Sequence, residues 1–378
     1  MTIKRRIVFV TGTRADFGKL KSLMSLLQSD NNFDIHIFVT GMHMLSKYGY
    51  TCEEVEKSGF RNIYKYVNQN ASDSMDHVLA KTVIGLSDYM KEISPDLLVV
   101  HGDRVETLAG ASVGALNNIL VGHIEGGEVS GTVDELIRHA VTKLSNIHFV
   151  ANDIAKTRLA QLGESEGSIH VIGSPDIDIM SSKTLPSIGE VKKHYELGFQ
   201  NYSILIFHPV TSELDDLHSH IATVVDQVIE SQRNYVVIYP NNDPGTDVVL
   251  REYTRFKNME RIKIFPSMRF EYFLTLLKHA DFIMGNSSAG VREAPHFGVP
   301  TINLGSRQFN RVKCDSIIDL PIEAAAIRTA FEKIRLTPRR ARELFGTGSS
   351  AASFHKIVSS KDFWKCDTQK HFVDRVMS

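Results

Sequence analysis

Cysteine is scarce in this sequence, and the few cysteines form no recognisable motif. Only three occur in 378 residues, Cys52, Cys314 and Cys366, and none belongs to a CxxC pair. A disulfide framework and a cysteine-based metal site are therefore not expected, and this cysteine usage fits the reducing cytoplasm. Because no other pattern indicates a metal or an organic cofactor, we expect a cytoplasmic protein that works without either.

An excess of charge of one sign is also lacking. The chain has 43 lysines and arginines and 44 aspartates and glutamates, which gives a formal net charge of −1. Nothing therefore predicts a broad basic surface for nucleic acid or a polybasic membrane signal, and we expect neither kind of partner. Any anionic ligand has to be held by a few local groups.

Long apolar runs are absent as well. No stretch of the sequence approaches the ~20 apolar residues of a membrane-spanning helix. The basic residues near the start precede an apolar run that ends at Gly12 after about six residues, which is shorter than the apolar region of a secretory signal. We interpret this run as a first β-strand.

What the sequence does contain is a regular alternation of strand-like and helix-like segments. Such alternation predicts an α/β protein with doubly wound parallel sheets, covered by helices on both faces. The expected strands are 7–10, 34–39, 97–100, 119–124, 147–150 and 169–172, followed by 203–207, 235–239, 262–265, 282–284 and 301–304. The expected helices in the first half are 18–28, 74–93, 105–117, 133–144 and 153–162.

The length suggests two domains, each large enough for its own core. We predict an N-terminal domain formed by 1–172 together with 360–378, and a C-terminal domain formed by 173–359. The two domains are expected to face a central cleft. Residues 360–378 are assigned to the first domain because apolar side chains recur there at roughly helical spacing, which predicts a terminal helix. These side chains are Phe363, Trp364, Phe372 and Val376.

The most informative stretch is 97–138, where charged side chains follow two predicted strands. In an open α/β sheet, residues just past the strand ends line the ligand crevice. Charged groups packed there are costly to bury unless they act on a ligand, so the stretch indicates an enzyme. The carboxylates are Asp103, Glu125, Glu128 and Asp134, and the basic or imidazole groups are His101, Arg104 and His123.

Simpler interpretations exist for two of these acids. Asp134 could pair with Arg138 four residues along a helix, and Asp103 could form a weak surface ion pair with Arg104. Glu125 is harder to explain in this way, because the two glycines that follow it leave it little flanking bulk. Three carboxylates that converge on one cavity repel each other, so at least one should have a raised pKa and act as acid or base.

Two turns are suited to an anion. In TGTRADFGK, residues 11–19, a glycine turn leads from the first strand into a helix with Arg14 and Lys19, although such turns are common in α/β domains. In the second half, Asn286, Ser287 and Ser288 come directly before a predicted helix, 289–297. Their caps and backbone N–H groups resemble a diphosphate cradle without a Walker lysine.

Two charged residues near this second turn complete the predicted ligand site. Glu293, expected one to two turns into the helix, is placed to accept hydrogen bonds from ribose hydroxyls, and Arg307 is placed to close on the phosphates. A capped helix with a surface Glu–Arg pair is the simpler alternative. His208, directly after the strand 203–207, is as often a structural hydrogen-bonding group as a catalyst at such a place.

Taken in order, several motifs are similar to those of the hydrolysing UDP-N-acetylglucosamine 2-epimerases. These are the bacterial enzymes that open sialic-acid synthesis, and the epimerase half of the bifunctional animal enzyme is similar. The resemblance covers nearly the whole chain and implies a two-lobed, GT-B-like fold of two Rossmann-type domains, with UDP on the second lobe. The motifs are GTRAD at 12–16, VHGDR at 100–104, HIEGGEVSGTVDELIRH at 123–139, HPVT at 208–211, NSSAGVREAPHFGVP at 286–300 and GSRQ at 305–308.

The resemblance also assigns roles by motif position. It implies that Asp103, Glu125 and Asp134 are catalytic acids and that His208 is an essential cleft histidine. The implied substrate-contacting residues are Arg14, Arg104, Asn241, Ser287, Ser288, Glu293 and Arg307, and PSMRF at 266–270 resembles the uracil-binding loop less closely. Non-hydrolysing relatives carry a glutamine before the histidine of a TGxH turn, where this chain has Met42. This difference favours the hydrolysing branch, without a second nucleotide-sugar as activator.

The implied reaction converts UDP-N-acetylglucosamine and water into UDP and N-acetylmannosamine. Elimination of UDP would give a 2-acetamidoglucal, and water would then add to this intermediate, with the proton delivered to the opposite face of C2 and the hydroxyl to C1. Alternatives are a UDP-2,4-diacetamido-trideoxy sugar as substrate, a GT-B glycosyltransferase, and a non-enzymatic nucleotide-sugar sensor. The resemblance also suggests a homodimer or larger homo-oligomer.

Overall fold

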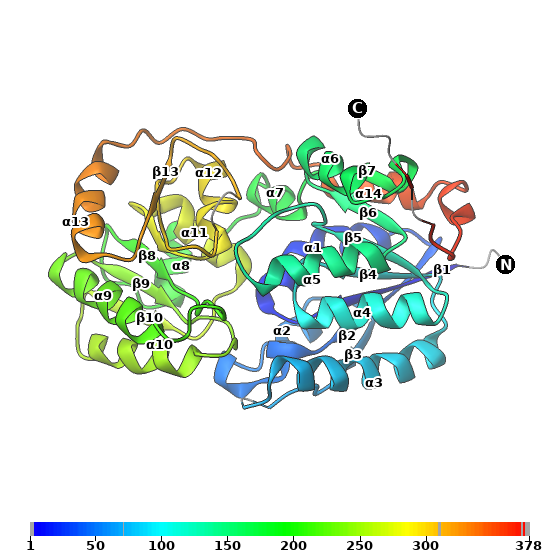
Figure 1. Cartoon of the computed structure of the whole chain (residues 1–378), viewed down its shortest axis with the longest axis horizontal. Helices are drawn as coiled ribbons and strands as arrows, with labels where there is room; N and C mark the ends of the chain where they lie inside the picture. Colours follow the sequence, from blue (N-terminus) through cyan, green and yellow to red (C-terminus); the bar gives the residue numbers. More distant parts are fainter. Residues whose placement is uncertain (1–3, 71, 309–310, 372, 375–378) are drawn as a thin grey trace. The chain divides into compact units, whose positions relative to one another are not determined.

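The computed structural model describes residues 4–70, 72–308, 311–371 and 373–374, and the chain divides into two compact units (Figure 1). Unit 1 comprises the described residues of Met1–Glu128, Asp134–Ser182 and Phe345–Ser378. Unit 2 comprises those of Val129–Val133 and Lys183–Leu344. The chain therefore leaves unit 1 after Glu128, passes through unit 2 for five residues and re-enters unit 1 at Asp134.

Unit 1 is built on a seven-stranded parallel sheet in the order β3-β2-β1-β4-β5-β6-β7. The chain order reverses between β1 and β4, which makes this pair the switch point where open α/β sheets bind ligands. The strands are β1 (Arg5–Thr11), β2 (Phe33–Val39), β3 (Asn62–Lys65), β4 (Leu97–His101), β5 (Leu120–Ile124), β6 (Ile147–Val150) and β7 (Ile169–Val171).

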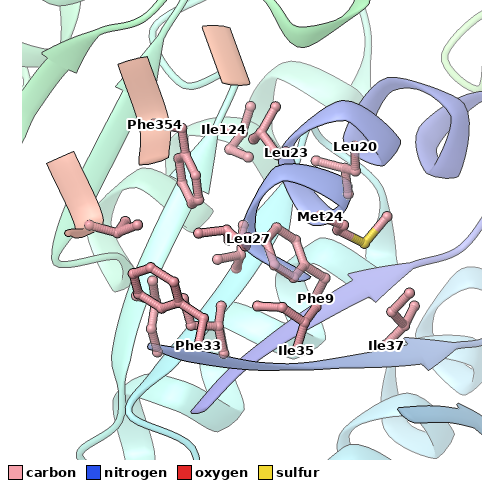
Figure 2. Close-up of a cluster of buried hydrophobic side chains, with 14 of the residues drawn as sticks. Phe9, Leu20, Leu23, Met24, Leu27, Phe33, Ile35, Ile37, Ile124 and Phe354 are labelled. Atoms are coloured by element: carbon pink, nitrogen blue, oxygen red, sulfur yellow. The ribbon is translucent and has the colours of Figure 1, made fainter. Parts of the chain in front are cut away.

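Helices cover this sheet, and apolar side chains fill the space between the two layers. Figure 2 shows Phe9 and Ile35 of the sheet facing Leu23 and Leu27 of α1. Phe354 of α14 packs on the same sheet, with its ring centroid 6.3 Å from that of Phe9. The helices are α1 (Arg14–Gln28), α2 (Cys52–Glu56), α3 (Met75–Ile93), α4 (Val105–Leu116), α5 (Val133–Leu144), α6 (Asp153–Gln161), α7 (Pro175–Met180) and α14 (Ser350–Val358).

Unit 2 contains a six-stranded parallel sheet in the order β10-β9-β8-β11-β12-β13. The strands are β8 (Ser203–Ile206), β9 (Tyr235–Ile238), β10 (Ile262–Phe265), β11 (Ile283–Gly285), β12 (Thr301–Leu304) and β13 (Ile317–Leu320). The helices are α8 (Ile188–His194), α9 (Leu217–Glu230), α10 (Thr246–Tyr253), α11 (Phe270–His279), α12 (Glu293–Phe297) and α13 (Ala324–Lys333).

Two segments that the sequence analysis assigns to the C-terminal domain, 173–182 and 345–359, group with unit 1. α7 and α14 lie in these segments and both pack against α1. Asp178 of α7 accepts the backbone N–H groups of Ser350 and Ala351 at 2.8 and 2.7 Å, which fixes the start of α14. The return of the chain to unit 1 thus begins earlier than the apolar pattern of 360–378 suggests.

The expected terminal helix is wrong for the residues that the structure describes. Phe363 and Trp364 lie in a single 3₁₀ turn, η7 (Phe363–Lys365), while Phe372 and Val376 lie outside the described residues. Beyond this turn the segment is held by hydrogen bonds to other residues of unit 1 instead of by its own helix. Asn146 donates to the carbonyl of Thr368 at 2.9 Å, and Lys370 donates to those of Thr142 and Ser145 at 2.7 Å each.

No helix among the described residues is long and apolar enough to cross a membrane.

Candidate active site

Glu125 lies directly after β5, in a backbone conformation that ordinary residues rarely adopt. Its φ is +68°, in the left-handed region, and Gly127 close behind has a φ of +77°. The Glu125 side chain is 7% exposed. Strained backbone of this kind costs free energy and concentrates at functional sites. Of the three predicted catalytic acids, Glu125 is the one with this backbone conformation.

The Glu125 carboxylate faces two cationic groups. Its Oε1 atom lies 3.5 Å from Lys19 Nζ and 3.5 Å from His101 Nε2, and the hydroxyl of Ser174 donates to it at 3.4 Å. Lys19 Nζ also lies 3.5 Å from a carboxylate oxygen of Asp176, whose side chain is 1% exposed. Cations this close favour the ionised form of a carboxyl group.

His101, the last residue of β4, is locked between two acids. Its Nδ1 atom donates to Asp16 at 2.7 Å, and Asp16 also accepts the backbone N–H of Gly12 at 3.1 Å. Burial by itself lowers the pKa of His101, but the charges of Glu125 and Asp16 outweigh this effect and raise the pKa to about 10. The ring is therefore an imidazolium at neutral pH.

We call these five side chains the acid–base cluster: Asp16, Lys19, His101, Glu125 and Asp176. Only Glu125 was among the predicted site residues, although Lys19 and His101 lie in the charged motifs that drew attention. Asp16 and Lys19 lie three residues apart, on one face of α1, and that spacing is a usable signal. The role of Asp176 has no local signal, because it depends on where α7 packs.

Asp103 forms an ion pair with Arg138, whose side chain is completely buried. Arg138 also donates to the carbonyl of Glu128 at 3.3 Å. Neither simple pairing considered from the sequence describes this contact, because it joins the turn after β4 to α5. Asp134 lies in the first turn of α5 and is half-buried. Arg104 directs its Nε atom to Glu106, 3.6 Å away.

Arg14, the first residue of α1, is also paired. Its guanidinium lies 2.7 Å from the carboxylate of Glu54 in α2, and both side chains are partly exposed. An anion that binds at this turn meets a guanidinium whose charge is already partly compensated.

In unit 2, the loops after β8, β9 and β11 are tied together around His208. The amide side chain of Asn286 accepts the His208 backbone N–H at 2.7 Å and donates to the His208 carbonyl at 2.8 Å. The backbone N–H of Asn241 donates to His208 Nδ1 at 3.1 Å. Because Nδ1 is an acceptor, the neutral ring carries its proton on Nε2. The structure thus brings together predicted residues from three separate motifs.

The expected continuous helix over 289–297 is wrong. Ser287 caps a short 3₁₀ turn, η5 (Ser288–Gly290), by accepting the backbone N–H of Ala289 at 3.3 Å, and α12 begins only at Glu293. Pro295 explains the break: it lacks the N–H that would bond to residue 291, and it is tolerated only in a first helical turn. Glu293 is consequently the first residue of α12, not one to two turns into a helix.

Arg307 closes this loop from the other side. Its guanidinium donates to the carbonyl of Asn286 at 3.2 Å, as does the side chain of Gln308 at the same distance. The carbonyl of Arg307 in turn accepts the backbone N–H of Gly131 at 3.0 Å. Arg307 and Glu293 are 9% and 3% exposed, so both side chains are buried and do not form the surface Glu–Arg pair considered as the alternative.

Among the described residues, no group of three or more histidine, cysteine, aspartate or glutamate side chains is arranged to hold a metal ion.

Residues 25–359 match the model of a family described as UDP-N-acetylglucosamine 2-epimerase. A UDP-N-acetylglucosamine 2-epimerase of Neisseria meningitidis serogroup B is 46% identical over 374 residues, which are 98% of this chain and 99% of the relative. A UDP-N,N'-diacetylbacillosamine 2-epimerase (hydrolyzing) of Legionella pneumophila is 32% identical over 365 residues, which are 94% of this chain and 96% of the relative.

A solved structure supports the architecture. The Methanocaldococcus jannaschii UDP-GlcNAc 2-epimerase, in complex with UDP-GlcNAc and UDP, matches with a TM-score of 0.78 at 24% identity, covering 94% of this chain and 99% of that chain. At this identity the likeness concerns the fold. The expected GT-B-like class of two Rossmann-type parallel-sheet domains is therefore confirmed.

Proposed function

Because the chain belongs to the UDP-N-acetylglucosamine 2-epimerase family, we propose that it is a hydrolysing 2-epimerase that converts UDP-N-acetylglucosamine and water into N-acetylmannosamine and UDP. The observation that carries the catalytic part of this proposal is the acid–base cluster. A nucleotide-sugar sensor has no need for a strained, buried carboxylate held between a lysine and an imidazolium, because burying these charges is costly.

The chemistry requires a base for the C2 proton while the anomeric C–O bond breaks. We assign proton acceptance to Glu125, because the two nearby cations favour its ionised form. Re-protonation from the opposite face of the ring needs a second group, for which Asp103 and Asp134 remain the candidates. The acid and the base lie on different sides of the glucal intermediate, which accounts for inversion at C2.

The diphosphate is assigned to unit 2. The Asn286 turn, with Ser287 and Ser288, offers backbone N–H groups, and Arg307 adds a positive charge. His208 carries its proton on Nε2, so it can donate to a phosphate oxygen as UDP departs. The remaining proposed substrate contacts are Arg14, Arg104, Asn241 and Glu293.

Hydrolysis, as opposed to reversible epimerisation of the intact nucleotide-sugar, is supported by two observations. Met42 stands where the non-hydrolysing pattern has a glutamine for an activating nucleotide-sugar. The Legionella relative is itself named as hydrolysing, and it matches nearly the whole chain. That relative also supports a second substrate candidate, UDP-N,N'-diacetylbacillosamine, which is the 2,4-diacetamido sugar considered from the sequence. We further propose a cytoplasmic homo-oligomer.

The decisive experiment incubates the purified protein with UDP-N-acetylglucosamine in D₂O, without any acceptor, and follows the products by NMR. We expect free UDP and N-acetylmannosamine with one deuterium at C2. Intact UDP-N-acetylmannosamine would contradict hydrolysis, and turnover only after an acceptor is added would indicate a glycosyltransferase. A parallel reaction with UDP-N,N'-diacetylbacillosamine compares kcat/KM for the two sugars and thereby decides between the substrates.

A further inference from the structure

Glu106, in the first turn of α4, is a buried carboxylate with no assigned role. Its side chain is 3% exposed. Neither of its carboxylate oxygens accepts a hydrogen bond from any residue that the structure describes. The Nε atom of Arg104 lies 3.6 Å from Oε2, too far for a hydrogen bond.

The position of this carboxylate is set by two glycines. A Cβ atom on Gly12, directly after β1, would lie 3.1 Å from the Glu106 carboxyl carbon, and one on Gly41, after β2, would lie 2.6 Å from Oε1. Glu106 therefore lies at the carboxyl ends of β1 and β2, beside the switch point between β1 and β4. Gly12 is also two residues from Arg14, a proposed substrate contact.

A carboxylate that is buried without hydrogen bonds is costly, and such groups in native structures usually have a partner that is missing from the protein itself. A phosphate is excluded as that partner, because two anions repel each other. A neutral hydroxyl donor suits it well, since O–H to carboxylate hydrogen bonds are short and strong. The hydroxyl-rich part of a nucleotide-sugar is its hexose ring.

We propose that Glu106 binds the sugar of the substrate by accepting a hydrogen bond from a ring hydroxyl. This inference rests on the proposed function, because it takes the ligand to be a UDP-hexosamine. It assigns Glu106 to sugar recognition, separate from the groups that hold UDP and from the acid–base cluster. The 3-hydroxyl is the ring hydroxyl that both candidate substrates share, whereas the 4- and 6-hydroxyls belong only to UDP-N-acetylglucosamine.

The test combines Glu106→Gln with the 3-, 4- and 6-deoxy analogues of UDP-N-acetylglucosamine. For the parent substrate we expect kcat/KM to fall about 10- to 100-fold, the usual effect of losing a hydrogen bond to a charged group. UDP, which lacks the sugar, should bind within about threefold of the wild-type affinity. For the wild type, one of the three deoxy analogues should have a kcat/KM that is lower than that of the parent substrate by a similar factor. With that analogue, the wild type and Glu106→Gln should have equal kcat/KM.

Glu92→Gln, an exposed change in α3, serves as the matched control and should behave as wild type with every substrate. If Glu106→Gln loses the same factor with all three analogues, no hydroxyl is coupled to the carboxylate and the proposal is overturned. A loss of UDP affinity or of thermal stability instead would make Glu106 a structural partner of Arg104. Failure of the proposed function is a separate result, because the wild type itself would then not release UDP from UDP-N-acetylglucosamine.

Discussion

The imidazolium of His101 and the carboxylate of Glu125 face each other at the ends of two neighbouring strands, with 3.5 Å between Nε2 and Oε1. Asp16 holds the other nitrogen of the ring at 2.7 Å, so the ring cannot turn away without breaking a charge-assisted hydrogen bond. His101 thus orients the proposed base and supplies part of the positive charge that favours its ionised form.

Replacing His101 by asparagine should lower kcat/KM about 100-fold, the scale expected when a reacting group is misplaced by about 1 Å. The affinity for UDP should stay near that of the wild type, since the proposed diphosphate contacts are elsewhere. His77→Asn, an exposed change in α3, is the control. Equal activity of the two variants would show that Glu125 does not depend on the ring.

His101 also predicts a pH dependence of stability. Its folded-state pKa of about 10 lies above the ordinary value of about 6.5 in the unfolded chain. The native state therefore binds more protons between these values, and the free energy of unfolding falls as pH rises. The stabilising effect is complete below about pH 6.5 and is lost as pH rises through about 10. Denaturant unfolding should show this decline for the wild type and a flatter profile for His101→Asn.

Glu125→Gln and Asp103→Asn should separate chemistry from structural support. Both changes should abolish turnover and leave UDP affinity within a few fold, because each removes a proposed proton-transfer group. Asp103→Asn should also lower thermal stability, since it removes the carboxylate partner of the buried Arg138, and Glu125→Gln should do so by removing the charge that faces Lys19 and His101. Asp103 is itself partly exposed, so a cost of about 2–3 kcal/mol is expected. If Glu125→Gln retains turnover, Glu125 is not the base.

The contacts of Lys370 test how the segment beyond η7 is attached to the rest of unit 1. Lys370 donates to two backbone carbonyls and pairs with Glu164, whose side chain is completely buried. Lys370→Met should therefore cost about 2–3 kcal/mol of stability, measured by thermal or denaturant unfolding. Lys361→Met, at an exposed position nearby, should change little. Equal stability of the two variants would mean that the segment contributes nothing to unit 1.

Much of the fold follows from the sequence because central parallel strands are buried on both faces and therefore appear as uninterrupted apolar runs. β3 and β13 were not predicted. Both are edge strands of four residues with partly exposed side chains, so their apolar pattern is weak. The break before α12 was signalled by Pro295, but the capping residues Asn286, Ser287 and Ser288 predicted that one helix begins directly after them, at residue 289.

The candidate site residues that could be predicted from the sequence are those that directly follow a strand. Glu125, Asp103 and His208 were found because each follows a buried strand, where side chains meet at one edge of a sheet. The partners of Glu125 and Asp103 were not found, because they come from distant segments. His101 and Asp16 are 85 residues apart, and Arg138 is 35 residues from Asp103. The catalytic and binding roles of these residues stay predictions.

Gly131 provides the last test, at the point where the chain crosses unit 2 between Glu128 and Asp134. A Cβ atom there would lie 2.2 Å from the carbonyl oxygen of Ser306, closer than any real contact. Gly131→Ala should therefore push the Ser306–Arg307 backbone away and weaken the 3.0 Å hydrogen bond from Gly131 N–H to Arg307 O.

Because Arg307 is a proposed phosphate contact, Gly131→Ala should weaken UDP binding about tenfold or more, as measured by calorimetry. Gly189→Ala is a matched control in the same unit, since a Cβ there meets nothing within 4 Å and alanine favours its helix, α8. If Gly131→Ala and Gly189→Ala bind UDP with equal affinity, the Arg307 loop does not take part in diphosphate binding. A defect in turnover with normal UDP affinity would instead locate the effect at Asp134, which follows the same short segment.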